Sequence, residues 1–163
     1  TGPAAGDRVL DAGTGTGILA AYLGRLGLEV TTYERDPEFA ATACENLRVT
    51  GVADRVEVRT GDVLDDVDDL TADEWDLVTL DTGDAPAVVE RAPDLLAPGA
   101  FVAVYAPFVE SARAAHQTAE SVGLSAVETY ETIQRRMRFD DRGSRPSTAG
   151  VGHTGYLTFA RRR

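Results

Sequence analysis

The residues with the clearest chemical potential lie near the start of the chain, where an acid precedes a run of alternating glycines. The stretch reads Val9-Leu10-Asp11-Ala12-Gly13-Thr14-Gly15-Thr16-Gly17, and an apolar-rich segment follows from Ile18. Glycines at 13 and 15 let the backbone turn sharply and let a ligand approach without a Cβ in the way, and the N–H groups at a helix start are free to donate hydrogen bonds. The pattern therefore predicts a strand, a tight turn and a helix that together hold a nucleotide-like group.

The glycine spacing disfavours a nicotinamide dinucleotide. That fold uses G-x-G-x-x-G/A, but the sixth position counted from Gly13 is Ile18, and the third glycine is instead Gly17. An acid two residues before alternating glycines resembles motif I of class I S-adenosylmethionine (SAM) methyltransferases, in which the turn faces the methionine end of the cofactor. The resemblance implies that SAM is the cofactor and that the turn binds it through Asp11, Gly13, Thr14, Gly15, Thr16 and Gly17. A glycine turn without a ligand is the alternative.

A second acid, Glu34, ends the next predicted strand about 20 residues after the first glycine, where a carboxylate accepts hydrogen bonds from ribose hydroxyls. Asp36 precedes Pro37 and supplies the cap of the following helix, so we expect Glu34 to have no local structural task. The adjacent Arg35 belongs to the same predicted binding set. A surface acid is the alternative for Glu34.

Two further acids follow predicted strands, Asp62 and Asp81. The carboxyl ends of strands meet at one rim of a doubly wound sheet, so Asp11, Glu34, Asp62 and Asp81 should converge there. In SAM enzymes a carboxylate at the position of Asp62 meets the adenine amino group, and the next N–H, that of Val63, meets a ring nitrogen. A turn or helix cap is the alternative for Asp62. The acids after position 62 do not match a D-x-D-x-D-G calcium loop, and we predict no metal site.

Hydrophobic periodicity and turn residues divide the chain into alternating strands and helices. Between the last two predicted strands there is no helix, so these two should pair antiparallel. Pro93 should bend or restart the helix that contains it. The expected strands are 8–11, 29–33, 56–59, 75–80, 99–105, 126–133 and 155–160, and the expected helices are 17–26, 37–49, 86–96 and 109–122.

Length and composition fit one α/β domain over residues 1–163, with 43% hydrophobic residues to form a core. Nothing in the sequence approaches the roughly 18 apolar residues of a membrane span, and nothing at the start resembles a signal peptide, so we expect a cytoplasmic protein. The single cysteine, Cys44, falls in a predicted helix and is expected to be a small buried residue.

Charge is distributed unevenly along the chain. The formal net charge is -11, and all 16 basic residues are arginine, a composition that suggests a halophile-like source. Residues 1–133 contain 8 Arg and 25 Asp or Glu, whereas residues 134–163 contain 8 Arg and only 2 Asp. A basic stretch on an otherwise acidic protein indicates contact with phosphates, here through Arg135, Arg136, Arg138, Arg142 and Arg145. A solvated loop with an arginine tail is the alternative.

The order of elements, the D-A-G-T-G-T-G turn and the C-terminal motif resemble the tRNA (adenine-N1)-methyltransferases that modify the T-loop. That motif is Arg145-Pro146 followed by Gly152-His153-Thr154-Gly155-Tyr156-Leu157. The resemblance implies a Rossmann-like fold with a mainly parallel seven-stranded sheet, an antiparallel last strand and helices on both faces. It also implies a tRNA substrate, with adenosines 57 and 58 as the targets of archaeal members, and a homotetramer. Family members carry an N-terminal β domain that we expect to be absent from this chain.

The resemblance implies that Asp81 lies beside the target base, and we expect it to be the catalytic residue. A carboxylate there would stabilise the positive charge that a base gains on methylation. His153 is expected to be a structural residue at a strand start. The chain departs from the family at Thr82-Gly83-Asp84-Ala85-Pro86, where a proline-rich stretch is usual, and at Ser111, where glutamine is usual. The alternatives are a precorrin-type methyltransferase, a non-catalytic tRNA-binding partner subunit, and a ligand-free Rossmann-like domain.

Overall fold

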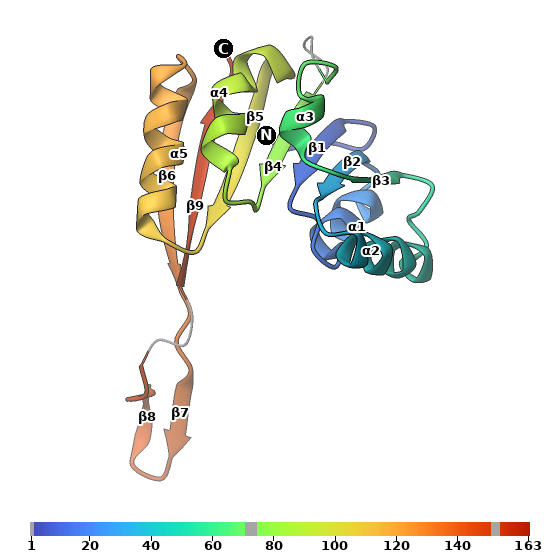
Figure 1. The fold of residues 1–163 in the computed structure, drawn as a ribbon. Helices are drawn as coiled ribbons and strands as arrows, with labels where there is room; N and C mark the ends of the chain where they lie inside the picture. The colour runs from blue at the N-terminus through green and yellow to red at the C-terminus, as the bar shows by residue number, and fades with distance from the viewer. Residues whose placement is uncertain (1, 71–74, 151–153) are drawn as a thin grey trace.

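The computed structural model of this chain describes residues 2–70, 75–150 and 154–163. It is an α/β structure in which helices flank a central sheet, and a long β-hairpin extends from one edge (Figure 1). The helices are α1 (Ile18–Arg25), α2 (Pro37–Thr50), α3 (Val63–Asp66), α4 (Ala85–Leu95) and α5 (Val109–Ser121). The strands are β1 (Arg8–Ala12), β2 (Glu29–Glu34), β3 (Val56–Thr60), β4 (Trp75–Leu80), β5 (Leu96–Ala106), β6 (Ser125–Ile133), β7 (Met137–Asp140), β8 (Gly143–Pro146) and β9 (Thr154–Arg161).

The main sheet confirms the predicted fold class. Its seven strands lie in the order β3-β2-β1-β4-β5-β9-β6. The pairs from β3 to β5 are parallel, whereas β9 runs antiparallel to both β5 and β6. The order reverses between β1 and β4, so the chain leaves a crevice beyond the carboxyl ends of these strands, where ligands of open α/β sheets bind.

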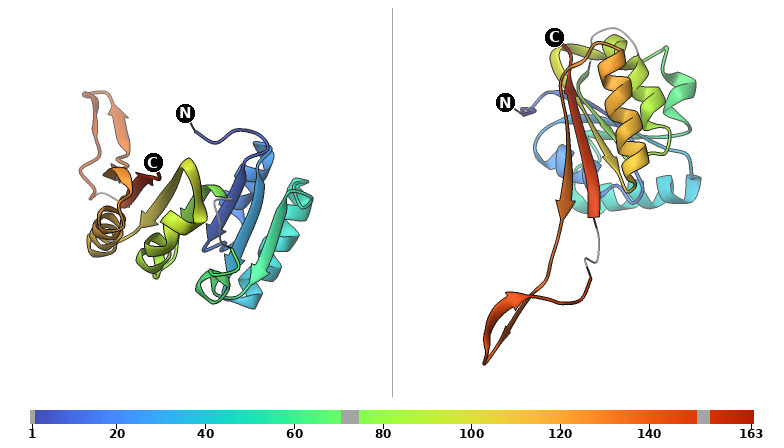
Figure 2. Two further views of the ribbon diagram at one scale, coloured as in Figure 1. Left: turned by 90° about the horizontal axis from the view of Figure 1, so that it is seen from above. Right: turned by 90° about the vertical axis from the view of Figure 1, so that its left-hand side faces the viewer.

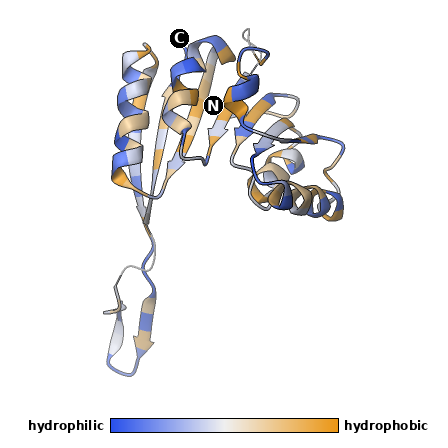
Figure 3. Ribbon diagram, viewed as in Figure 1, coloured by the Kyte–Doolittle hydropathy of each residue, from blue (hydrophilic) through white to orange (hydrophobic). Residues whose placement is uncertain are grey.

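Helices cover both faces of the sheet, as Figure 2 shows from two further directions. Alternation along β1 divides the core: Val9 packs with α1 and α2 on one face, and Leu10 packs with α3, α4 and α5 on the other. Hydrophobic and hydrophilic residues alternate along α4 and α5, as expected of helices with one buried side (Figure 3). No helix in the described part of the chain is long and apolar enough to cross a membrane.

Local signals fix the helix ends. The side chain of Asp36 accepts hydrogen bonds from the backbone N–H groups of Glu38 and Phe39, Pro37 begins α2, and Gly51 ends it in a left-handed conformation. The expectation for Cys44 was wrong: it is exposed, because it lies one position beyond the buried Ala43 on α2. A single helix, α4, passes through Pro93 and ends two residues later, so the helix does not restart at the proline.

The hairpin of β7 and β8 was not predicted. Residues Gln134 to Thr154 were interpreted as a basic segment between two strands, but the structure pairs Met137 with Pro146 and Asp140 with Gly143 in an antiparallel ladder. Gly143 has a positive φ of 125° after the two-residue turn Asp141-Arg142. The hairpin continues from β6 and returns into β9, and it projects from the sheet edge at which β5 ends (Figures 1 and 2).

Candidate active site

A buried hydrogen-bond network anchors the glycine turn at the end of β1. The carboxylate of Asp11 accepts hydrogen bonds from the hydroxyls of Thr32 on β2, at 2.6 Å, and Thr79 on β4, at 2.5 Å. The Thr32 hydroxyl oxygen in turn accepts a hydrogen bond from Thr14 in the turn, at 2.5 Å. Asp11 therefore ties the three central strands together directly beneath the turn. Its burial raises the pKa of its carboxyl, although the two threonine hydroxyls act in the opposite direction.

The turn lies against the backbone at the end of β4. Gly13 has a φ of 96°, and its N–H donates to the carbonyl of Tyr33 at 3.0 Å. A Cβ built on Gly13 would lie 2.1 Å from the carbonyl oxygen of Asp81, so only glycine fits there. The Asp81 N–H donates to the carbonyl of Ala12 at 2.8 Å. The spacing between the turn and Asp81 is thus set by backbone contact.

The strand ends enclose a cavity of about 330 Å³ beside this turn. Seven of the predicted cofactor and catalytic residues line it: Gly13, Gly15, Glu34, Arg35, Asp62, Val63 and Asp81. Ala12, Tyr33, Phe39, Gly61 and Thr82 complete the lining. The convergence predicted for the strand-end acids is confirmed for Glu34, Asp62 and Asp81, whereas Asp11 lies below the cavity floor and is only 2% exposed.

Glu34 has a structural task, contrary to our expectation. One carboxylate oxygen accepts the N–H of Gly15 at 2.8 Å, and the other accepts the N–H of Asp36 at 3.0 Å. These bonds aim the carboxylate across the turn into the cavity. Each oxygen retains a second lone pair, so the side chain can still accept hydrogen bonds from a ligand.

Asp62 has the role of a helix cap, which the sequence left as the alternative, and its contact with adenine stays a prediction. It caps α3 by accepting the N–H of Leu64 at 3.0 Å, and its other oxygen lies 2.8 Å from the guanidinium of Arg35. Arg35 also pairs with Asp84, the residue before α4. The arginine therefore connects the ends of β2, β3 and β4 across the mouth of the cavity.

A second cavity of about 220 Å³ adjoins the first on the side of β5 and shares Asp81 and Thr82 with it. Tyr105 and Phe108 contribute its aromatic lining, and Ser111 lies on the first turn of α5. The side chain of Asp81 is exposed, but protein atoms around the carboxyl remove part of its hydration, and this burial raises the pKa of Asp81. One acidic residue thus borders two adjoining cavities.

The C-terminal glycine motif supports the second cavity. A Cβ on Gly155 of β9 would lie 2.4 Å from a ring carbon of Tyr105, so the ring rests on the bare backbone of the glycine. Gly152 and His153, which belong to the same motif, lie outside the described residues.

Several predicted residues do not enter either cavity. Asp11 and Thr14 are buried in the network beneath the turn, and Thr16 and Gly17 line a separate groove between α1 and α2. Cofactor contact by these four stays a prediction. Conversely, Tyr33, Phe39 and Phe108 were missed. No signal in the sequence sets Tyr33 and Phe39 apart, and only the structure shows that both line the cavity.

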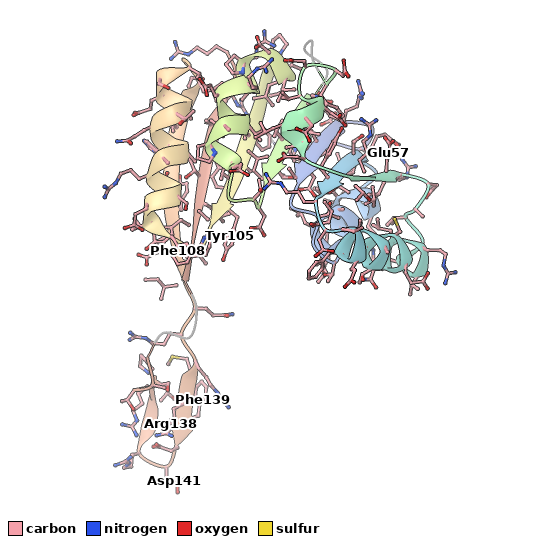
Figure 4. All side chains as sticks on the ribbon, viewed as in Figure 1. Glu57, Tyr105, Phe108, Arg138, Phe139 and Asp141 are labelled. Carbon is pink, nitrogen blue, oxygen red and sulfur yellow. The ribbon has the colours of Figure 1, made fainter. Side chains whose placement is uncertain are left out.

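The predicted RNA-contacting arginines divide into two groups on the hairpin. Arg135, Arg136 and Arg138 line a concavity of about 730 Å³ at its base and form no ion pair with any described residue. Arg142 and Arg145 instead lie 3.9 and 3.5 Å from the carboxylate of Asp140. Figure 4 shows Arg138 and Phe139 on the hairpin below the edge where Tyr105 and Phe108 lie.

A sheet in this order, with an acidic cavity over a glycine turn at its carboxyl edge, defines the class of SAM-dependent methyltransferases. The model of the methyltransferase domain family matches residues 9–99, more than half of the chain, so the chain belongs to this family. The cavity residues fit SAM: acids face a cationic sulfonium ligand, Glu34 offers free lone pairs, and the turn carries no side chain at Gly13 and Gly15.

Among the relatives, a tRNA (adenine(57)-N(1)/adenine(58)-N(1))-methyltransferase, TrmI, from Methanocaldococcus jannaschii is 32% identical over 96% of this chain and 64% of its own length. The chain thus spans less than two thirds of that protein. A SAM-dependent O-methyltransferase from Thermotoga maritima has a TM-score of 0.84 and 27% identity, covering 98% of this chain and 60% of the other. TrmI from Aquifex aeolicus has a TM-score of 0.81 and 27% identity, covering 96% and 62%. Solved precorrin methyltransferases, 16% and 19% identical, share the fold alone.

Proposed function

We propose that this domain, residues 1–163, transfers a methyl group from SAM to N1 of an adenosine in the T-loop of tRNA, at position 57 or 58. The observation that carries the proposal is the pair of cavities that meet at Asp81. A methyl donor in the larger cavity and an acceptor in the smaller one would face each other across this carboxylate. Similarity to TrmI over nearly the whole chain supports adenine N1 as the acceptor atom.

The chemistry requires little from the protein beyond positioning and charge. When bound, SAM supplies a sulfonium methyl group, whose transfer leaves neutral sulfur and moves the positive charge onto the acceptor. Adenine N1 carries a free lone pair near neutral pH, so no proton has to be removed before it reacts. Asp81 as a carboxylate would stabilise the cationic ring as it forms and could accept a hydrogen bond from the exocyclic amine. Alignment of the two ligands accounts for much of the remaining rate enhancement.

The hairpin supports tRNA as the source of the acceptor. It projects from the sheet edge that carries the two cavities, and the three arginines at its base, which form no ion pair with a described residue, offer a concave cationic surface to phosphates. The body of the protein is strongly acidic and would repel a polyanion elsewhere. A T-loop adenosine must be unstacked to reach Asp81, which is the usual requirement of enzymes that modify bases.

Cavity size disfavours a tetrapyrrole acceptor. The second cavity, at about 220 Å³, is smaller than the roughly 300–1,000 Å³ of sites for drug-sized ligands, and a macrocycle is larger still. A non-catalytic partner subunit is disfavoured because Glu34, Asp62 and Asp81 remain together around an open cavity. A structural subunit has no need of that arrangement.

We further propose that the protein is a homo-oligomer, as the resemblance implies, that acts in the cytoplasm, where its tRNA substrate would be available. Met137 and Phe139 are 45% and 75% exposed on the hairpin. A two-stranded hairpin is marginally stable alone, and burial of these side chains against another copy would stabilise it. Light scattering of the chain and of Phe139→Glu tests this, and a monomer at all concentrations would contradict it.

The reaction is tested by incubating the chain with methyl-labelled SAM and an unmodified tRNA transcript. We expect label at N1 of one T-loop adenosine, mapped by reverse-transcription stops, because N1 methylation blocks base pairing. A transcript with both candidate adenosines replaced by guanosine is the matched control and should remain unlabelled. Label on the control, or transfer to a tetrapyrrole but not to tRNA, would contradict the proposal.

A further inference from the structure

Phe108 is an exposed aromatic residue in a position that gives the fold no benefit. It is the N-cap of α5, has an extended backbone and makes no side-chain capping hydrogen bond. Serine, threonine, asparagine or aspartate at an N-cap is more favourable for the helix. The ring is 65% exposed, so it contributes little to the core. Local stability therefore does not explain a phenylalanine here.

Phe108 instead lines the smaller cavity, which Asp81 also lines. Phe108 and Tyr105 both belong to this lining, as do Asp81 and Ser111. Figure 4 shows Phe108 and Tyr105 together at the edge of the sheet from which the hairpin extends. Tyr105 is only partly exposed and rests on Gly155, whereas Phe108 lies at the open side. The cavity thus combines an exposed aromatic residue with an acidic one in a single lining.

We propose that Phe108 is an acceptor-binding residue that stacks on the flat ring of the unstacked base and favours its cationic, methylated form. This inference rests on the proposed function for the identity of the base. The face of an aromatic ring is attracted to a cation, and stacking on an aromatic side chain is a general means of holding a single-stranded base. Phe108 would therefore contribute twice, through stacking before the transfer and through a cation–π interaction as the charge develops.

The chain provides matched controls for this proposal. Tyr22 on α1 is also 65% exposed but lines the separate groove between α1 and α2. Phe39 is half exposed and lines the larger cavity, beside the predicted cofactor site. Loss of the Phe108 ring should weaken use of the acceptor, loss of the Phe39 ring should weaken SAM binding, and loss of the Tyr22 ring should change neither.

The first experiment measures single-turnover methylation of tRNA by Phe108→Leu, Phe108→Trp, Phe39→Leu and Tyr22→Leu, with thermal melting to verify folding. Stacking of one base corresponds to a loss of about 5- to 100-fold in kcat/KM for tRNA in Phe108→Leu. Its affinity for SAM should be unchanged, and Phe108→Trp should restore most of the rate. Equal rates in Phe108→Leu and Tyr22→Leu would overturn the inference and leave the proposed function intact.

The second experiment is independent of catalysis. Binding of 1-methyladenosine, which is cationic, and of adenosine is followed by NMR titration of the wild-type chain and Phe108→Leu. We expect the wild type to prefer 1-methyladenosine and Phe108→Leu to show a smaller preference, because the Asp81 carboxylate remains. If the wild type fails to methylate tRNA yet shows the preference through Phe108, the proposed function fails and the inference stands. If the wild type shows no preference, or Phe108→Leu keeps it undiminished, the inference fails.

Discussion

Asp81 is the residue on which the proposed chemistry depends, because it lines both cavities. Asp81→Asn keeps the side-chain shape but removes the charge that would offset a cationic base. We expect the methyl-transfer rate to fall by roughly 10²-fold, as for one preorganised electrostatic contact, with little change in SAM affinity. Single-turnover methylation of tRNA measures the rate and calorimetry measures the affinity.

Because the pKa of Asp81 is raised, we also predict that the methyl-transfer rate depends on pH. The ionised form is the active one, so the rate should decrease as the pH falls through the raised pKa, at a higher pH than for an ordinary aspartate near 3.9. The rate of Asp81→Asn should not show this decrease at low pH. Equal rates in the two proteins, or an equal decrease of both rates at low pH, would show that Asp81 takes no part in catalysis. Asp81 would then be a turn residue, a role that asparagine fills equally well.

Glu34 is expected to hold the ribose of the cofactor. Glu34→Ala removes two charge-assisted hydrogen bonds to the ribose hydroxyls and should weaken SAM binding by about 2 to 3 kcal/mol. It also removes the acceptor of the Gly15 N–H, so the turn should loosen slightly. Glu38→Ala, on the first turn of α2 and outside the cavity, is the control. Unchanged calorimetric affinity in Glu34→Ala, or tighter binding of NAD than of SAM, would refute the cofactor assignment.

At the scale of elements, the turn that joins β1 to α1 requires glycine for two reasons: close packing at Gly13 and a left-handed backbone at Gly15. Gly13→Ala places a methyl group against the backbone of Asp81, with its Cβ 2.1 Å from the carbonyl oxygen, at a φ of 96°. We expect a loss of about 3 kcal/mol or more in the free energy of unfolding, because the backbone of β4 has to move. Gly15→Ala meets open space at a φ of 53°, so only left-handed strain of about 1 to 2 kcal/mol applies.

Urea unfolding of the two variants separates close packing from backbone strain. A similar loss in both proteins would mean that conformation alone requires glycine in this turn. A Gly13→Ala variant as stable as the wild type would show that the turn and the end of β4 are not in contact.

At the scale of the whole molecule, cationic charge is concentrated on a hairpin that projects from an acidic body. Replacement of Arg135, Arg136 and Arg138 by Gln should reduce the slope of log K against log salt for tRNA binding by about 2 to 3, since each phosphate contact contributes about 0.7 to 0.9. Arg142 and Arg145 lie beside Asp140, which already offsets their charge. Their replacement by Gln should therefore change the slope less per arginine.

Filter binding at several salt concentrations measures both slopes. An unchanged slope in the triple variant would show that these three arginines do not contact tRNA phosphates. Equal changes per arginine in the two variants would show that the ion pairs with Asp140 do not persist in the complex.

The sequence by itself determined the sheet and the position of its ligand edge. The strands β1 and β4 are short and mostly apolar, α2 has local caps at Asp36 and Gly51, and the acids at the strand ends come to one edge because parallel strands share their direction. These features depend on neighbours in the chain or on the topology they impose. Glu34, Asp62 and Asp81 could therefore be placed together from sequence.

The tertiary structure decided the features that depend on packing between distant segments. Asp11 is buried because the hydroxyls of Thr32 and Thr79 reach it from neighbouring strands. Phe108 and Asp81 line one cavity only because β4 and β5 are adjacent. The hairpin carries no long apolar pattern, so its two strands were not predicted within the basic segment, and pairing across the Asp141-Arg142 turn leaves both faces exposed. Where a side chain's environment comes from residues far along the chain, spacing alone does not determine it.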